Sequence, residues 1–276
     1  MAITFNVSTV PSEPRGPGVT RQDLLTHEKL KGINLLLDRI TLSAGASIEI
    51  ETSAQSLIWL LLLDGEATLT TTYKQELSQP QSVLLPPRFK AALSTENGAS
   101  LLYLEIPDLG PIDPAFAAGP PFFTVLNWRR EEVYVCDRDA RKRVFMVSPQ
   151  ACGTKALHAA MAIYPPRTMA ADFHREGALG FMYILEGRGT VAADGRSFPV
   201  GPGDFVYVAD RERHSFKAAD DSEMRFLTFN VPGEFKTVWA DPSKASPWKA
   251  TKRDISGGMT AQDEERRRQQ ASSFGI

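Results

Sequence analysis

The chain has 276 residues, 42% of them hydrophobic, so it can form one large packed domain or two smaller ones. Its formal net charge of −2, with no basic segment spread along it, argues against nucleic acid or an anionic membrane as a partner. The longest apolar run, residues 57–63, is too short to span a bilayer, and the N-terminus lacks the basic and apolar regions of a secretory leader. Because two cysteines make no disulfide framework, we expect reduced thiols and a cytoplasmic protein.

In chain order, residues 24–37 fit either a helix or a strand. The continuous apolar run at residues 57–63 then ends at Asp64-Gly65, and residues 107–121, rich in proline and glycine, form a linker. Such short apolar runs between turn signals are typical of a β-sandwich or a β-barrel.

The second half follows the same plan. It begins with an expected strand at residues 156–161, and further strands follow at residues 181–185, 190–193, 197–200, 205–208 and 224–230. Asp194-Gly195 predicts a hairpin turn between two of them. Near the end, Thr260 opens a capping box before a polar run at residues 264–270, which predicts a solvated helix or a frayed tail.

The chain also repeats itself. Leu185-Glu186-Gly187 matches Leu63-Asp64-Gly65 at an offset of 122 residues, and the same offset places residues 224–227 on residues 102–105 without a gap. Two copies of one β-rich unit are therefore expected. We place the first in residues 1–110 and the second in residues 111–245, followed by a polar tail at residues 246–276.

Two of the four histidines stand in a pattern that suits metal binding. His174 and Glu176 are two residues apart, so on a strand their side chains share one face. His214 can reach the same point from a neighbouring strand. Two imidazoles and one carboxylate form the ligand set of an open transition-metal site, which favours Fe(II) and leaves Mn, Ni and Zn open.

These residues resemble the cupin superfamily, and the repeat resembles a bicupin. The first family motif is commonly written G-x5-H-x-H-x3,4-E-x6-G, and here it stands as His174-x-Glu176-x3-Gly180-x6-Gly187. The second motif keeps Gly203 and His214. The resemblance implies an all-β chain of two tandem cupin barrels, also described as jelly rolls or double-stranded β-helices. The sequence departs from the family in having Glu176 at the place of the second histidine and Gly180 at the place of the glutamate. Gly180 leaves a position open for water or substrate.

Only the second barrel has candidate ligands. The offset of 122 maps the four ligand positions onto Thr52, Ala54, Ile58 and Ala92, which are poor ligands, so we expect one divalent metal ion per chain. Ureidoglycine aminohydrolases are similar bicupins with metal only in the C-terminal half, although their ligands differ in type at every position. Quercetinase-type cupin dioxygenases are the other comparison.

His158 lies on an expected strand just before the site and is a candidate general base, with packing as the alternative. Our leading interpretation is a metal-dependent enzyme that acts on a small organic molecule, with dioxygenase-type oxidoreductase chemistry favoured. The alternatives are a metal-assisted hydrolase, lyase or isomerase, and a non-catalytic cupin that binds a small ligand. A homodimer is a further expectation. The cupin fold does not decide among these functions.

Overall fold

The computed structural model describes residues 3–25, 34–193 and 195–265. Their regular secondary structure is almost entirely β-strand, as predicted. They form two compact units. The N-terminal barrel comprises residues 6–126 and 148–156. The C-terminal barrel comprises residues 3–5, 127–147 and the described residues from 157 onward. These bounds differ from those expected, because residues 3–5 and the described residues after 245 belong to the C-terminal barrel, while residues 111–126 and 148–156 belong to the N-terminal barrel. No described helix is long and apolar enough to cross a membrane.

The N-terminal barrel is built on one branched sheet in the order β11-β8-β6-β10-β4-β3-β2, with β7 and β9 paired to β6 and β5 to β9. Its elements are η1 (Val7–Thr9), β2 (Glu13–Gly16), β3 (Val19–Leu25), β4 (Leu36–Leu42), β5 (Ser47–Glu51), β6 (Leu57–Thr70), β7 (Lys74–Ser78), β8 (Gln81–Leu85), β9 (Lys90–Ser94), β10 (Ala99–Ile106), β11 (Thr124–Asn127) and α1 (Pro149–Cys152). The ambiguous segment thus contributes the end of β3 and the start of β4, and residues 26–33 lie outside the described residues.

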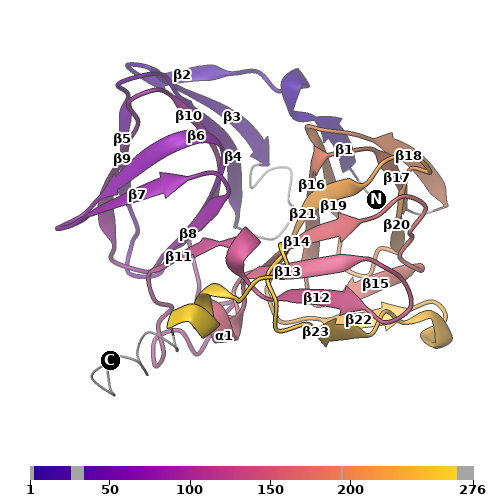
Figure 1. Ribbon diagram of the computed structural model, residues 1–276. Helices are drawn as coiled ribbons and strands as arrows, with labels where there is room; N and C mark the ends of the chain where they lie inside the picture. The colour runs from indigo at the N-terminus through magenta and orange to yellow at the C-terminus, as the bar shows by residue number, and fades with distance from the viewer. Residues whose placement is uncertain (1–2, 26–33, 194, 266–276) are drawn as a thin grey trace. The chain divides into compact units, whose positions relative to one another are not determined.

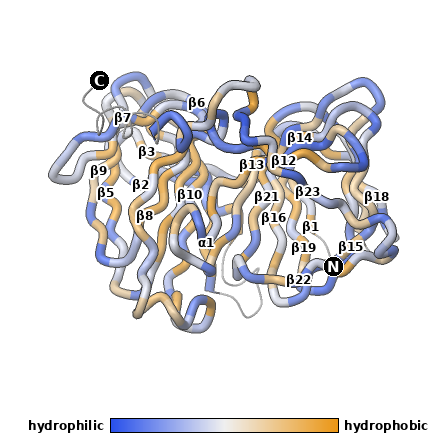
Figure 2. Tube along the Cα trace, turned by 60° about the horizontal axis from the view of Figure 1, so that its bottom comes forward, coloured by the Kyte–Doolittle hydropathy of each residue, from blue (hydrophilic) through white to orange (hydrophobic). Residues whose placement is uncertain are grey.

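Strand β6 explains the long apolar run of the first half. Ile58, Leu60 and Leu62 belong to the barrel core, while Trp59 and Leu61, on the other face, are also buried. A strand that is buried on both faces has a continuous run of hydrophobic residues in its sequence instead of an alternating pattern. Figure 2 shows the central strands of both barrels largely in the hydrophobic colour.

The C-terminal barrel has two sheets, in the orders β1-β19-β16-β21-β14-β13-β12-β23 and β18-β17-β20-β15-β22. Its elements are β1 (Ile3–Asn6), η2 (Trp128–Arg130), β12 (Val133–Cys136), β13 (Lys142–Val147), β14 (His158–Tyr164), β15 (Phe173–Glu176), β16 (Leu179–Glu186), β17 (Gly189–Ala193), β18 (Arg196–Val200), β19 (Asp204–Val208), β20 (His214–Ala218), β21 (Met224–Val231), β22 (Lys236–Trp239), η3 (Pro242–Lys244) and β23 (Trp248–Ala250). The core lies between the sheets. Met182 and Val206 from the larger sheet meet Val191 and Phe216 from the smaller one.

Both ends of the chain contribute to this barrel. Strand β1 forms the sheet edge beside β19 (Figure 1). The rings of Phe5 and Phe205 lie 5.4 Å apart. Strand β23 pairs with β12, so the expected tail begins with a strand of the barrel. Residues 261–265 are helical, and Thr260 Oγ1 accepts a hydrogen bond from the Asp263 amide at 3.2 Å, as the capping box predicts. The rest of the polar run lies outside the described residues.

The internal repeat is real but carries insertions. Gly65 and Gly187 occupy equivalent turns, with φ of 78° and 73°, where an added Cβ would overlap the carbonyl oxygen of Gly98 or Glu223. Trp59 pairs with Leu104, and Phe181 pairs with Phe229. The first residues of these two pairs differ by 122 positions and the second by 125. The ungapped match of residues 224–227 to residues 102–105 is therefore wrong by three residues.

Candidate functional site

The short strand β15 decides which side chains enter the C-terminal barrel. Phe173 belongs to the core and Arg175 is only 7% exposed, so this pair faces inward. Alternation along a strand then turns His174 and Glu176 to the other face, where their side chains are 16% and 33% exposed. Phe173 of β15 pairs directly with His214 of β20, and the two rings lie 4.3 Å apart. His214 therefore shares the inner face with Phe173, not with His174.

The structure thus places the three predicted metal ligands on two faces of the small sheet. On the outer face, His174 Nε2 lies 3.5 Å from Glu176 Oε1, and Lys236 Nζ lies 3.9 Å from Glu176 Oε2. On the inner face, His214 is 3% exposed and its Nδ1 lies 2.9 Å from the Glu212 carbonyl oxygen. Across residues 3–25, 34–193 and 195–265, no group of three or more His, Cys, Asp or Glu side chains could hold a metal ion. The predicted ligand set does not fit a single metal here.

The inner face instead holds an arginine–asparagine pair. Arg175 Nη1 donates to Asn230 Oδ1, and Asn230 Nδ2 donates to the Leu179 carbonyl oxygen at 3.1 Å. Asn230, at the end of β21, is fully buried and pairs with His158 on one side and Gly180 on the other. A Cβ on Gly180 would lie 3.4 Å from Asn230 Nδ2, so Gly180 leaves the space that this amide fills.

A second arginine and several aromatic rings surround this pair. The Arg143 guanidinium, from β13, lies over the Trp248 ring at 4.7 Å, and that of Arg175 lies over the Phe235 ring at 4.6 Å. The His158 ring packs at 5.3 Å from Phe145 and at 5.5 Å from Phe235. The mouth of the barrel is therefore both cationic and aromatic. We call Arg143, His158, Arg175, His214 and Asn230 the mouth cluster.

The charges of the mouth cluster repel one another. Burial, followed by repulsion from Arg143 and Arg175, lowers the pKa of His158 to about 3. Burial also lowers the pKa of His214 to about 4, and nearby Arg175 and His174 act in the same direction. The pKa of Arg175 falls to about 9, through burial and then through Arg143. Both imidazoles are therefore neutral at pH 7, while both guanidiniums stay charged.

The sequence interpretation found His158 and His214 but missed Arg143, Arg175 and Asn230. Arg175 lies inside the motif, but the spacing that begins at His174 assigns the ligand positions to residues 174 and 176 and none to Arg175. A signal for Asn230 did exist, since it continues the alternation of Met224, Phe226 and Thr228 along the inner face of β21. Nothing in the sequence pointed to Arg143.

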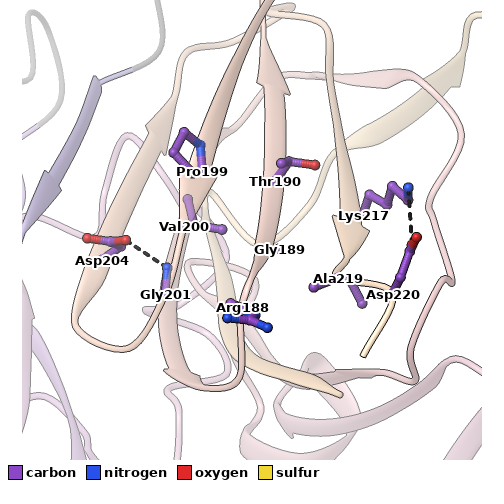
Figure 3. Close-up of a pocket in the computed structure, with 11 residues that line it drawn as sticks. Arg188, Gly189, Thr190, Pro199, Val200, Gly201, Asp204, Lys217, Ala219 and Asp220 are labelled. Atoms are coloured by element: carbon purple, nitrogen blue, oxygen red, sulfur yellow. Dashed lines mark hydrogen bonds and ion pairs between the residues drawn. The ribbon is translucent and has the colours of Figure 1, made fainter. Parts of the chain in front are cut away.

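A separate surface pocket of about 580 Å³ lies at the far end of β20 from His214 (Figure 3). Its charged side chains already have partners. Lys217 Nζ lies 3.5 Å from Asp220 Oδ1, and Asp204 Oδ2 accepts from the Gly201 amide at 2.7 Å. Arg188 is paired with Asp221. This pocket is a weaker candidate than the mouth cluster.

Comparisons with known proteins agree with this fold. The Cupin domain family matches residues 160–230, which include the mouth-cluster residues from β15 to β21. No curated protein matches the chain. Oxalate decarboxylase from Bacillus subtilis is similar in structure, with a TM-score of 0.66 and 15% identity over 86% of this chain and 78% of that one. The protein Ylba from E. coli, of family DUF861, gives a TM-score of 0.67 and 12% identity over 84% and 91%.

At these identities the two solved structures support the fold and not a shared activity. The family match lies in the C-terminal barrel, while the structural similarity extends across both barrels. Residues 160–230 are therefore a cupin domain, and the chain has the two-barrel fold that its repeat predicted.

Proposed function

We propose that the C-terminal barrel binds a small organic molecule at the mouth cluster, without a metal ion held there. The observation that carries this proposal is the inward side chain of Arg175, 7% exposed and directed to Asn230. A guanidinium stays charged and offers only hydrogen-bond donors, so it cannot ligate a metal and repels a cation. It is well suited to holding an acceptor group of a ligand.

Binding is better supported than proton-transfer catalysis. A general base works best when its pKa lies near the working pH, and the pKa values of His158 and His214 are about 3 and 4. Both imidazoles are therefore weak bases in the unliganded barrel. Of the three functions expected from the sequence, the non-catalytic ligand-binding cupin fits this site best, and His158 acts as part of the binding surface.

The metal-dependent enzyme, with dioxygenase-type or hydrolytic chemistry, is the second candidate. It is supported by the cupin fold and by the His174–Glu176 pair at 3.5 Å, which supplies two ligands of the predicted set. His214 lies on the opposite face, so the third ligand would have to come from elsewhere. This weakens the case for iron or another divalent metal at the predicted residues.

Elemental analysis of the purified protein separates the two candidates. We expect well under one metal ion per chain, with the same value in His174→Ala and in His214→Gln. A stoichiometry near one that both variants abolish would restore the metal-dependent enzyme and overturn our proposal. An oxygen-consumption screen of the wild type would then identify oxidase or dioxygenase chemistry.

A screen of small organic molecules by thermal shift tests binding itself. A ligand present at 100 times its Kd stabilises the folded protein by about 2.7 kcal/mol. We expect the stabilising molecules found with the wild type to have no effect on Arg175→Met and to keep their effect on Arg188→Met. Arg188 is an exposed arginine that is paired with Asp221. Hits that survive Arg175→Met would place the ligand elsewhere.

A further inference from the structure

Three arginines, Arg141, Arg143 and Arg175, lie near one another in the C-terminal barrel. Among the described residues, only Arg141 has a carboxylate partner. Arg141 is 3% exposed and fully engaged, with Nε 2.8 Å from Asp139 Oδ2 and Nη2 donating to Ser246 at 2.7 Å. Arg143 and Arg175 differ, because no ion pair joins either one to a carboxylate within the part of the chain that the structure describes. The buried Nε atoms of Arg143 and Arg175, and Nδ1 of His158, have no hydrogen-bond partner there.

This arrangement is unfavourable without an anion. A buried charge is costly unless it is paired and hydrogen-bonded, and two like charges raise the cost further. Arg143 lies close enough to Arg175 for the two like charges to repel each other. An oxyanion between the two guanidiniums would accept from their free Nε–H groups and remove the repulsion.

We propose that the mouth cluster is a binding site for a small organic carboxylate, held by the guanidiniums of Arg143 and Arg175 with its apolar part against the surrounding rings. This inference rests on the function proposed above and names the class of its ligand. A carboxylate presents two acceptor oxygens in one plane, which match the paired N–H donors of a guanidinium. His158 would contribute its Nδ1 when that nitrogen carries the proton.

The aromatic residues favour a carboxylate with an organic body over inorganic phosphate. The Phe235 and Trp248 rings pack against the two guanidiniums, at 4.6 and 4.7 Å, and Phe145 packs against His158. Such surfaces gain free energy by covering an apolar group and gain nothing from a hydrated phosphate. Both anions share the oxyanion chemistry, so the experiment must separate them.

The test uses isothermal titration calorimetry on the full chain with benzoate, benzamide and inorganic phosphate at fixed chloride concentration. Benzamide has the shape of benzoate but no charge. We expect benzoate to bind at least about tenfold more tightly than benzamide, because a hydrogen bond to a charged group contributes more than one to a neutral group. Phosphate should bind more weakly than benzoate. Arg143→Met and Arg175→Met should each weaken benzoate binding at least about tenfold, and Arg188→Met should leave it unchanged.

The outcomes separate this inference from the function on which it rests. Equal affinity for benzoate and benzamide, both lost in Arg175→Met, would overturn the carboxylate while leaving a small-molecule site. Tighter binding of phosphate than benzoate would also overturn it. Should Arg175→Met fail to fold, Arg143→Met, whose side chain is half-buried, tests the same site, and unchanged benzoate binding there would overturn the inference. A metal held by His174 and His214 would overturn the proposed function itself.

Discussion

The two barrels share a strand plan but fill their interiors with opposite charge. Strand pairing makes Thr52 of the N-terminal barrel equivalent to Arg175, and Glu105 equivalent to Asn230. The N-terminal interior then adds Asp38, buried to 1% exposure on the same face as the core residue Ile40. It is therefore acidic where the C-terminal interior is cationic.

The barrels also differ in how these charges are satisfied. In the N-terminal barrel Arg21 Nη2 lies 2.7 Å from Asp38 Oδ2, Arg21 Nε lies 2.9 Å from Asp23 Oδ1, and the Tyr103 hydroxyl donates to Glu105 at 3.2 Å. Each of these charges lies beside a partner from the same barrel, although the buried Arg21 Nε and Asp38 Oδ2 make no hydrogen bond within the described part of the chain. In the C-terminal barrel Arg143 and Arg175 have no carboxylate partner among the described residues. The two barrels thus differ in whether their interior charges lie beside an opposite charge.

The largest expected effect on stability concerns Asp38 of the N-terminal barrel. Burial, only partly offset by Arg21, raises its pKa to about 7. Between its ordinary value near 3.8 and 7, the folded state holds a proton that the unfolded state has lost. Stability should therefore fall as pH rises through this window, by about 4 kcal/mol at most, because one pKa unit corresponds to about 1.36 kcal/mol.

Urea denaturation of wild type and Asp38→Asn from pH 4 to pH 8 tests this. The difference between the two free energies of unfolding should change across the window, with the variant gaining relative to the wild type at high pH. Hydrogen exchange of β4 and β10 peptides assigns the transition to the N-terminal barrel. Parallel curves for the two proteins would show that Asp38 does not titrate in this range.

A smaller effect should be common to both barrels. Gly65→Ala and Gly187→Ala each put a Cβ on a left-handed residue and against the carbonyl oxygen of the residue that precedes the neighbouring strand. We expect each change to cost about 3 kcal/mol of unfolding free energy, combining backbone strain with overpacking. Chemical denaturation measures both.

Matched controls separate the two contributions. Gly45 and Gly195 have φ of 76° and 71°, but an added Cβ meets nothing within 4 Å. Alanine there should cost about 1–2 kcal/mol, the strain alone. Equal losses at Gly187 and Gly195 would mean that the close approach of the strands contributes nothing.

The smallest expected effect on stability tests the difference between the two barrels most directly. Arg175→Met removes a buried charge that has no carboxylate partner among the described residues, but it also leaves Asn230 Oδ1 without its donor. These two effects oppose each other, so without ligand the free energy of unfolding should change by no more than about 1 kcal/mol. Arg141→Met removes a paired arginine and should cost about 3 kcal/mol. Denaturation of the two variants side by side measures this. Similar large losses in both would mean that Arg175 is already compensated and that the mouth cluster needs no anion.

Most of the fold could be predicted from the sequence. The strand at residues 57–63, the hairpin around Asp194-Gly195 and the duplicated Gly65 and Gly187 all follow from local chemistry that the structure confirms, although Asp194 itself lies outside the described residues. The three-residue drift of the repeat could not be predicted. An insertion in a loop leaves no trace in the periodicity of the strands on either side.

The site could be predicted only in part, because its strand register is weakly specified. Strand β15 is four residues long, Phe173 to Glu176, and polar side chains stand on both of its faces. With no alternation of apolar and polar residues, the sequence fits either register, and a slip of one residue exchanges the two faces. The inner-face positions 173, 175, 180 and 214 also fit the motif spacing, with four residues between 175 and 180.

Strand β1 ties the two ends of this chain into one sheet. It covers one edge of β19, whose other edge pairs with β16, and both of these strands come far later in the sequence. During synthesis β1 therefore stays unpaired until the C-terminal barrel has been synthesised, and this long-range contact is slow to form. A fragment starting at Asn127 would expose the backbone groups of β19 as an open edge, and such edges recruit strands from other molecules. The second barrel should thus aggregate when expressed alone, and supplying the first segment as a separate peptide should restore its solubility.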